Sequence, residues 1–304
     1  MTKTNARAIV DGALRSCLPP GRFLFVCLVL SVLFHVSAAA QKAIDVPRLS
    51  RMIGQGSVEE KREALFQIRN LRSEAASRLA LPALRDQDEM VRATAASSVV
   101  FLPSPDAATA VLPLLNDKSE FVRREAAYAL GEIGDTSATA PLIALLQKER
   151  ILEARSAAAA GLGRIGDPAA VASLTAILKG RPQEDDEFLR RSAARSIGQI
   201  AQGLKTGNTR VLTPQNFLPG KFKEIPPATE GFESKYPQFG PSVEVLLGTL
   251  RSSSETDDTR REAAFALGAI GSESAVSALE IESASKDPYL AEISKEALLK
   301  IRKQ

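Results

Sequence analysis

A twelve-residue phrase that occurs twice is the strongest constraint on the fold of this chain. Arg123 to Gly134 reads RREAAYALGEIG and Arg260 to Gly271 reads RREAAFALGAIG, so ten of twelve residues match at an offset of 137. Weaker copies follow one another at steps of 31, 31, 32, 35, 70 and 31 residues. A period of this length predicts a stack of repeated units. The copies begin at Lys61, Arg92, Arg123, Arg155, Arg190, Arg260 and Ala291.

Each copy has the pattern of a helix followed by a second, shorter helix. In the third copy, Val122, Ala126, Leu130 and Ile133 form one apolar stripe at helical spacing. Glycines after the stripe favour a left-handed helix end, and alanines within it allow close helix packing. A hairpin of about 31 residues cannot bury its stripe alone, so neighbours must stack. We therefore predict an all-α solenoid of about six to seven helical hairpins.

The phrase also resembles a known repeat. Asp117 to Asp135 reads D-x-S-E-x-V-R-R-E-A-A-x-A-L-G-x-I-G-D, which is similar to HEAT repeats of the short kind related to phycobilisome lyases. The resemblance covers residues 58–303. It implies that the helices carrying Val-Arg line the concave side. Because most such proteins are interaction scaffolds without shared catalytic residues, it transfers no catalytic residue to this chain.

The first 40 residues have the pattern of an export signal. Basic residues precede the apolar run Phe23 to Val36, and small residues Ser37 to Ala40 follow it. This order predicts a signal peptide at residues 1–40 and an exported, periplasmic or secreted protein. The alternative is an uncleaved anchor with the domain outside the cytoplasm, although the apolar run is shorter than the roughly 20 residues of a spanning helix.

Removal of this leader changes the chemistry available to the chain. The whole sequence has 39 basic and 36 acidic residues, and the leader holds four basic residues and one acidic residue, so the remainder has 35 of each. A neutral domain has no overall field that attracts nucleic acid. The leader also holds His35, Cys17 and Cys27, so the remainder has no His, Cys or Trp. We therefore expect no enzyme, no cofactor and no metal site of imidazole or thiolate type.

The double step of 70 residues contains an insertion. We divide the chain into a signal peptide (1–40), a linker (41–56) and a solenoid (57–304) with an insertion at 202–242. The insertion has six prolines, which exclude a hidden helical repeat. Its aromatic residues favour packing over disorder, either as a lid on the solenoid or as a partner-binding arm. The aromatic residues proposed to bind a partner are Phe217, Phe222, Phe232 and Tyr236.

One arginine recurs at the same position of each repeat, often six residues after an acid. We interpret it as a structural ion-pair ladder between layers rather than as an anion-binding site. The ladder residues are Arg92, Arg123, Arg155, Arg190 and Arg260.

A second set of residues lies on the opposite face of the same helices. Arginine and aromatic side chains are the usual anchors of protein interfaces, so we predict that this face binds an extended or acidic protein partner. The alternative is an ordinary solvated face. The predicted binding residues are Arg124, Tyr128, Arg164, Arg191, Arg195, Arg261 and Phe265.

Two classes of function remain from the sequence. The first is a non-enzymatic scaffold or adaptor outside the cytoplasm, a monomer or part of a hetero-complex, that binds a protein partner. The alternative is an enzyme or enzyme subunit related to phycobilisome lyases. Export opposes the alternative, since pigment attachment occurs in the cytosol. Neutral charge, export and the absence of Trp oppose nucleic-acid binding.

Overall fold

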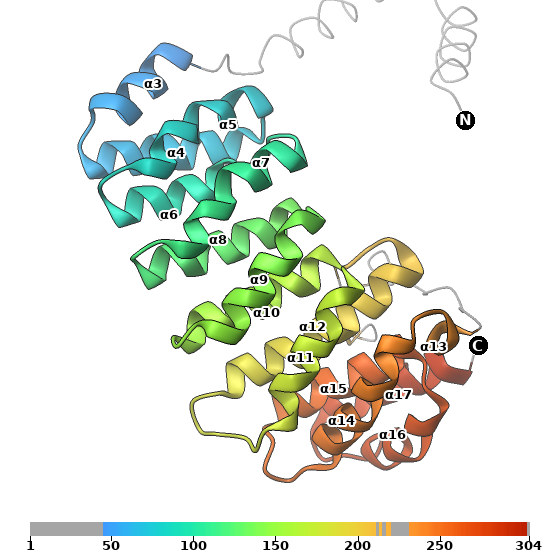
Figure 1. Ribbon diagram of the computed structural model, residues 1–304. Helices are drawn as coiled ribbons and strands as arrows, with labels where there is room; N and C mark the ends of the chain where they lie inside the picture. Colours follow the sequence, from blue (N-terminus) through green and yellow to red (C-terminus); the bar gives the residue numbers. More distant parts are fainter. Residues whose placement is uncertain (1–44, 211–212, 215–216, 220–230, 303–304) are drawn as a thin grey trace, which may run out of the picture. The chain divides into compact units, whose positions relative to one another are not determined.

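The computed structural model describes residues 45–210, 213–214, 217–219 and 231–302 of the 304-residue chain. Within these ranges every regular element is helical, and helix pairs follow one another along the chain (Figure 1). The prediction of an all-α solenoid is confirmed. The predicted leader, residues 1–40, lies outside the described residues. None of the described helices is long and apolar enough to cross a membrane.

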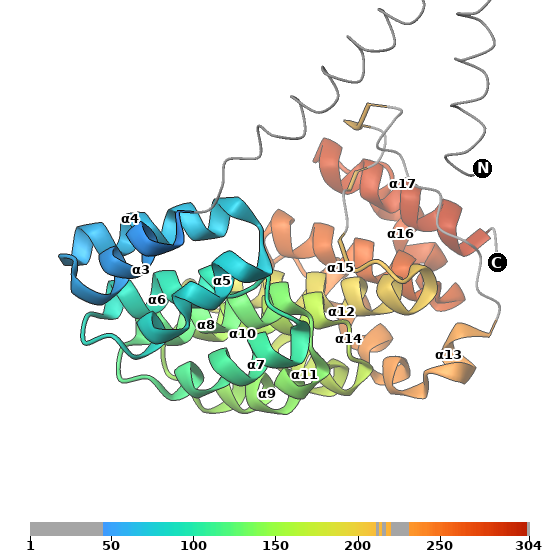
Figure 2. The ribbon, with the colours of Figure 1, turned by 90° about the horizontal axis from the view of Figure 1, so that it is seen from above.

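The helices lie in two rows (Figure 2). The inner row consists of α4 (Val58–Leu71), α6 (Glu89–Ser98), α8 (Glu120–Ile133), α10 (Leu152–Ile165), α12 (Glu187–Thr206), α15 (Asp257–Ile270) and α17 (Pro288–Arg302). The outer row consists of α3 (Val46–Gln55), α5 (Glu74–Ala80), α7 (Ser104–Val111), α9 (Thr139–Lys148), α11 (Val171–Lys179), α14 (Gly240–Arg251) and α16 (Val276–Glu282). The short helix α13 (Phe232–Lys235) precedes α14. 3₁₀ turns extend or introduce outer helices at Leu81–Arg85, Leu112–Asn116, Thr136–Ala138, Pro168–Ala170, Pro237–Phe239 and Glu273–Ala275.

The ends of the inner helices follow from local sequence signals. Gly134, Gly166 and Gly271 end α8, α10 and α15 in the left-handed conformation, with φ of 75°, 80° and 82°. Glycine adopts this conformation without the steric penalty of a Cβ atom. Asp167 then accepts a hydrogen bond from the Ala169 N–H, and Pro168 opens the next turn. The repeated glycines therefore separate the two helices of each hairpin.

Neighbouring inner helices approach to backbone contact. A Cβ atom added at Gly131 of α8 would lie 2.6 Å from the Cα of Gly161 in α10. A Cβ atom at Gly268 of α15 would lie 2.6 Å from the Cα of Ala297 in α17. The alanines between these points are buried, as the small-residue pattern predicts. This spacing makes the inner row the tightly packed side of the stack.

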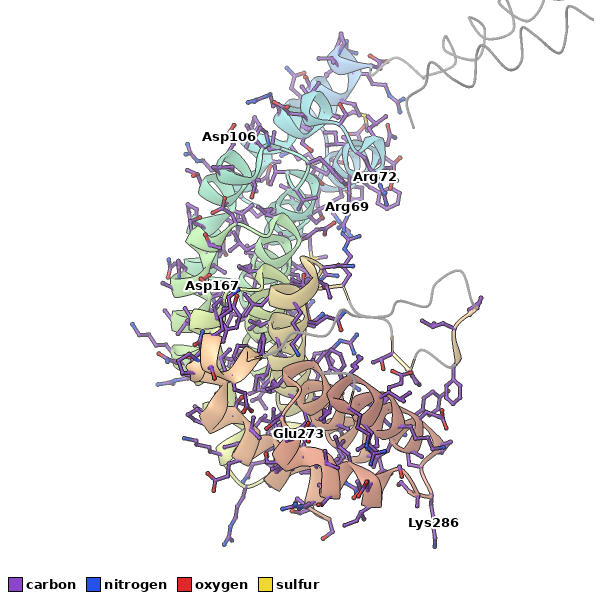
Figure 3. All side chains as sticks on the ribbon, turned by 90° about the vertical axis from the view of Figure 1, so that its right-hand side faces the viewer. Arg69, Arg72, Asp106, Asp167, Glu273 and Lys286 are labelled. Atoms are coloured by element: carbon purple, nitrogen blue, oxygen red, sulfur yellow. The ribbon has the colours of Figure 1, made fainter. Side chains whose placement is uncertain are left out.

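The inner row also lies on the concave side. The side chains of Arg69 in α4 and Glu132 in α8 approach within 3.3 Å, although α6 lies between these two helices. Side chains of helices two layers apart can meet only on the side of the stack where the layers lie closer together. Figure 3 shows Arg69 and Arg72 on this hollow side and Asp106 on the opposite side. The helices that carry Val-Arg therefore line the concave surface.

Two predicted boundaries are wrong. Residues 46–55, which we expected in a linker, form α3, whose Leu49 and Ile53 are buried. The insertion is shorter than 202–242, because α12 continues to Thr206 and α14 already begins at Gly240. Proline at the second position of α14 is compatible with a helix start, since the first N–H groups of a helix have no intrahelical acceptor. The insertion between the two helices thus spans residues 207–239, within which the structure describes the short helix α13.

Gly131→Ala tests the close packing of the inner row. The added methyl group must push α8 away from Gly161, so we expect a loss of about 1–3 kcal/mol in the free energy of unfolding. Gly248→Ala is the matched control, because no atom lies within 4 Å of its added Cβ in α14. There we expect a gain of up to about 1 kcal/mol from helix propensity. Urea unfolding followed by circular dichroism measures both, and equal effects would contradict the packing argument.

Candidate binding surface

Ion pairs connect most of the inner helices to the segment before the next one. Arg92 in α6 bonds to Asp117 with 2.7 Å between Nε and Oδ2, and also donates to the backbone carbonyls of Asp86 and Gln87. Arg123 in α8 bonds in the same way to Glu149, at 2.6 Å. Each of these arginines therefore bonds to backbone carbonyls of the loop before its own helix and to a carboxylate in the loop before the next inner helix. The ladder pairs are Lys61–Asp86, Arg92–Asp117, Arg123–Glu149, Arg190–Glu255 and Arg260–Glu282.

Two carboxylates of the ladder, those of Asp117 and Glu149, have a lowered pKa and are held in the ionised form. Burial raises the pKa of Asp117, but hydrogen bonds from Arg92 and the Ser119 N–H outweigh it, so its pKa lies below the ordinary value. The hydrogen bond from Arg123 lowers the pKa of Glu149. Such groups stabilise the fold above the pKa of the unfolded chain, and their contribution is lost as pH falls through the folded pKa.

The pair between Arg190 and Glu255 crosses the insertion. Both side chains are buried, with 2% and 4% of their surface exposed. The Arg190 guanidinium also donates to the carbonyls of Ile177 and Gly180, both at 3.0 Å, and of Leu178 at 3.2 Å, which satisfies its remaining N–H groups. The ladder therefore continues from α12 to α15 as if the intervening loop were absent.

Arg155 departs from this pattern. Its Nε donates to the carbonyl of Leu146 at 3.0 Å, within its own hairpin. Glu184, the acid that precedes the next ladder residue, is exposed. The longer step of 35 residues to Arg190 moves this acid away from the expected position, since extra residues lie in the loop between α11 and α12.

Most arginines of the predicted binding face are paired with acids. Arg124 lies beside Glu125 and over the ring of Phe121, at 4.8 Å from the ring centroid. Arg191, Arg195 and Arg261 each pair with an acid of the following inner helix or of the loop before it. Arg261 also lies 5.1 Å from the centroid of the Tyr289 ring. These pairs are Arg191–Asp258, Arg195–Glu262 and Arg261–Asp287. The face is thus a mixed-charge surface rather than a row of free cations.

Tyr128 and Arg164 remain accessible on the concave side. Tyr128 is partly exposed, and burial of part of its ring raises the pKa of its hydroxyl. Arg164 is exposed at the C-terminal end of α10, and its charge acts on Tyr128. The two side chains come from neighbouring inner helices, so they form one patch.

The expectation that Phe265 is exposed is wrong. Its side chain is 2% exposed and lies against Gly198 of α12, where an added Cβ would be 2.4 Å from the ring. The missing side chain of Gly198 opens a space that the phenyl ring fills. Lys300 of α17 covers the ring from the other side, with its Nζ 5.4 Å from the centroid.

The aromatic residues of the insertion are divided between core and surface. Phe232 is 2% exposed and packs against Tyr236 and Phe239, with ring centroids 5.0 and 5.2 Å away. Phe217 is 52% exposed and meets Tyr289 edge to face, at 5.3 Å. Phe222 lies outside the described residues. Phe232 is therefore an anchor of the insertion, and Phe217 is one of its accessible aromatic residues.

The sequence interpretation missed Phe66. It occupies the position of Tyr128 when the repeats are aligned on Lys61 and Arg123, and 59% of its surface is exposed on α4. The repeat alignment contained this signal. An exposed phenylalanine on the concave side extends the patch of Tyr128 and Arg164 to the first inner helix.

Lys205 lies at the end of α12, where the insertion leaves the solenoid. Its Nζ donates to the carbonyl of Ile270 at 3.2 Å and lies 4.7 Å from the centroid of Phe232. Burial and, to a smaller extent, the charge of Lys300 together lower its pKa to about 8, and Glu233 acts in the opposite direction. Lys205 thus joins the last turn of α15 to the aromatic anchor of the insertion.

Comparisons with known proteins agree with this architecture. The family model described as HEAT repeats matches residues 46–129 and 109–198, which together span just over half of the chain. This chain is a HEAT-repeat protein. A model of the PBS lyase HEAT-like repeat matches residues 259–280. Curated protein sequences gave no match.

Solved structures share the fold at low sequence identity. Kap121p is 16% identical with a TM-score of 0.56, covering 87% of this HEAT-repeat protein and 27% of Kap121p. An engineered protein is 21% identical with a TM-score of 0.52, covering 86% and 69% of the two chains. The complex of CpcE and CpcF of phycocyanin lyase from Nostoc sp. PCC7120 is 20% identical with a TM-score of 0.46, covering 83% and 85%. These similarities concern the fold alone.

Arg190→Met tests the ladder. The change leaves the buried carboxylate of Glu255 and the carbonyls of Ile177 and Gly180 without their donor, so we expect a loss of about 3–5 kcal/mol in the free energy of unfolding. Arg78→Met removes an exposed pair with Glu74, in which both side chains are 51% exposed. This control should change stability by less than about 1 kcal/mol. Chemical denaturation measures the loss in the free energy of unfolding for both variants. Losses of similar size would contradict a structural role of the ladder.

The pH dependence of stability tests the environment of Lys205. Between its folded pKa of about 8 and its ordinary value of 10.5, the unfolded chain binds more protons, so stability rises with pH. We expect a rise of up to about 1 kcal/mol from pH 8 to 9.5 in urea titrations, less than the full pKa shift gives, because solvent screens the partly exposed ammonium group. Lys205→Met should flatten this rise, whereas Lys295→Met, at an exposed lysine of α17, should preserve it. An unchanged slope in the Lys205 variant would contradict the assignment.

Proposed function

We propose that this HEAT-repeat protein is a non-enzymatic scaffold that binds a protein partner on its concave surface, outside the cytoplasm. Repeat folds of this kind commonly mediate protein interactions, because stacked layers present one long surface. The observation that carries the proposal is the concave patch of Phe66, Tyr128 and Arg164, in which the aromatic ring of Phe66 is 59% exposed. Aromatic and arginine side chains of this kind supply most of the binding energy in protein interfaces.

The charges of the surface define the kind of partner. Because Arg124, Arg191, Arg195 and Arg261 already have acidic neighbours, a purely acidic partner would gain little from them. A partner segment with apolar or aromatic side chains and charges of both signs fits better. The concave groove runs across successive layers, so this segment is extended rather than globular.

The location outside the cytoplasm rests on the sequence pattern of residues 1–40. A cleaved leader gives a periplasmic or secreted scaffold, and an uncleaved one gives an anchored scaffold with the same exposed surface. Detection of the N-terminal peptide by mass spectrometry of the protein from its own cells distinguishes the two.

A lyase-related function is the alternative that one observation favours, namely the PBS lyase HEAT-like repeat at residues 259–280. In that case the protein would be an enzyme or enzyme subunit that acts on a tetrapyrrole-carrying protein. Incubation with a bilin and a candidate acceptor protein, followed by detection of a covalent adduct, tests it.

Photo-crosslinking from the concave patch tests the scaffold. A photoreactive residue at position 128 should capture a defined partner in cells, and one at Arg85 on the outer row should not. With the purified partner, the triple variant Phe66→Ala, Tyr128→Ala, Arg164→Ala should weaken binding by at least about 10-fold in calorimetry. The matched control is Arg85→Ala with Ile281→Ala, two exposed outer-row residues. Equal affinity of the two variants would refute the concave site.

A further inference from the structure

The first part of the insertion lies on the concave surface of the solenoid. The Thr209 hydroxyl donates to the carbonyl of Arg164 in α10 at 2.9 Å, and Gln199 of α12 donates from Nε2 to the carbonyl of Thr209 at 3.1 Å. The Thr209 methyl group fills the space over Gly166 and Gly203, where added Cβ atoms would lie 2.9 and 2.6 Å from it. The two glycines and two hydrogen bonds thus form a seat for one threonine.

The same stretch continues to the last inner helix. The Thr213 hydroxyl donates to Oε2 of Glu296 in α17 at 3.0 Å, and Glu296 is only 7% exposed. Pro214 is buried, and Phe217 meets Tyr289 at the start of α17. Thr209, Thr213 and Phe217 are each four residues apart. The contacts of Thr209 thus lie on α10 and α12, and those of Thr213 and Phe217 lie on α17.

The solenoid residues that make these contacts occupy repeat positions whose side chains are accessible in the first half of the solenoid. When the copies are aligned on their starting residues, Arg164 and Gln199 occupy the position of Glu132, and Glu296 occupies that of Tyr128. The concave rows therefore face solvent on α4 and α8. On α10 the chain's own residues bond only the backbone carbonyl of Arg164, whose side chain stays exposed, and on α12 and α17 they bond the side chains of Gln199 and Glu296. One surface thus has an open half and a half that is filled in cis.

We propose that the filled half, formed by α10, α12 and α17, is itself a polypeptide-binding surface that Thr209, Thr213 and Phe217 occupy in cis. Its external ligand is an extended segment of the partner that repeats their chemistry, with two hydroxyl side chains and one aromatic side chain at intervals of four residues. This inference extends the proposed function, because a partner on the open half is placed to displace the cis segment. The insertion then sets how much of the surface a partner can use.

A labelled peptide with the sequence of residues 208–219 is the probe. The full chain carrying Thr209→Val, Thr213→Val and Phe217→Ala has a weakened cis segment and should bind the peptide at least about 10-fold tighter than the unaltered chain in fluorescence anisotropy. The reason is that an intact cis segment competes at an effective concentration of about millimolar. Adding Gln199→Ala and Glu296→Ala to this variant should remove the gain in peptide affinity. A peptide with Arg210→Ala, an exposed residue, is the matched control and should bind within about 2-fold of the parent.

Equal peptide affinity for the weakened and the unaltered chain would overturn the inference, as would no binding at about 1 mM peptide. Circular dichroism and urea midpoints show that the variants are folded. If the triple variant is unstable, Thr213→Val alone replaces it, with an expected gain of about 3-fold. Cross-linking from position 128 is measured on the same variants. If no partner is captured at the open half, the proposed function fails, and that result is separate from the peptide affinities that test this inference.

Discussion

The close approach of the inner helices is the constraint on which the rest of this structure depends. Gly131 meets Gly161, and Gly268 meets Ala297, at distances that exclude a larger side chain at either glycine. Backbone contact along the inner row shortens that side of the stack and makes it concave, so that Arg69 and Glu132 meet across two layers. Larger side chains are thereby displaced to the edges of each helix interface, where they either pair with one another or face the groove.

The electrostatics follow from this displacement. The base near the start of most inner helices reaches the carboxylate before the next, as in Arg92–Asp117 and Arg190–Glu255. Arg191 and Arg195 are neutralised by acids of α15 in the same way. A chain with equal numbers of acidic and basic residues outside residues 1–40 thus uses many of them between layers. What remains to recognise a partner is aromatic surface rather than net charge.

Tyr128 and Phe265 show where prediction from the sequence reaches its limit. They occupy the same repeat position, yet Tyr128 is partly exposed and Phe265 is buried. Gly198 of α12, the inner helix before Phe265, occupies the repeat position that Val100 occupies in the turn after α6, before Tyr128. The ring therefore turns into the space over a glycine in one layer only. The exposure of a repeat position depends on the neighbouring layer, and no single copy of the repeat contains that information.

The sequence by itself determined the repeated helices from α4 onward, their order and most of their ends, because apolar periodicity and the glycines after each stripe act over a few residues of chain. It also located the insertion, since a doubled step and six prolines cannot be hidden in a regular stack. Only the tertiary structure decided which arginines are paired, which aromatic residues stay open, and that Thr209 and Thr213 lie on the concave surface. Those outcomes depend on residues far apart in the chain, such as Thr213 and Glu296, which only the stacking of layers brings within hydrogen-bonding distance.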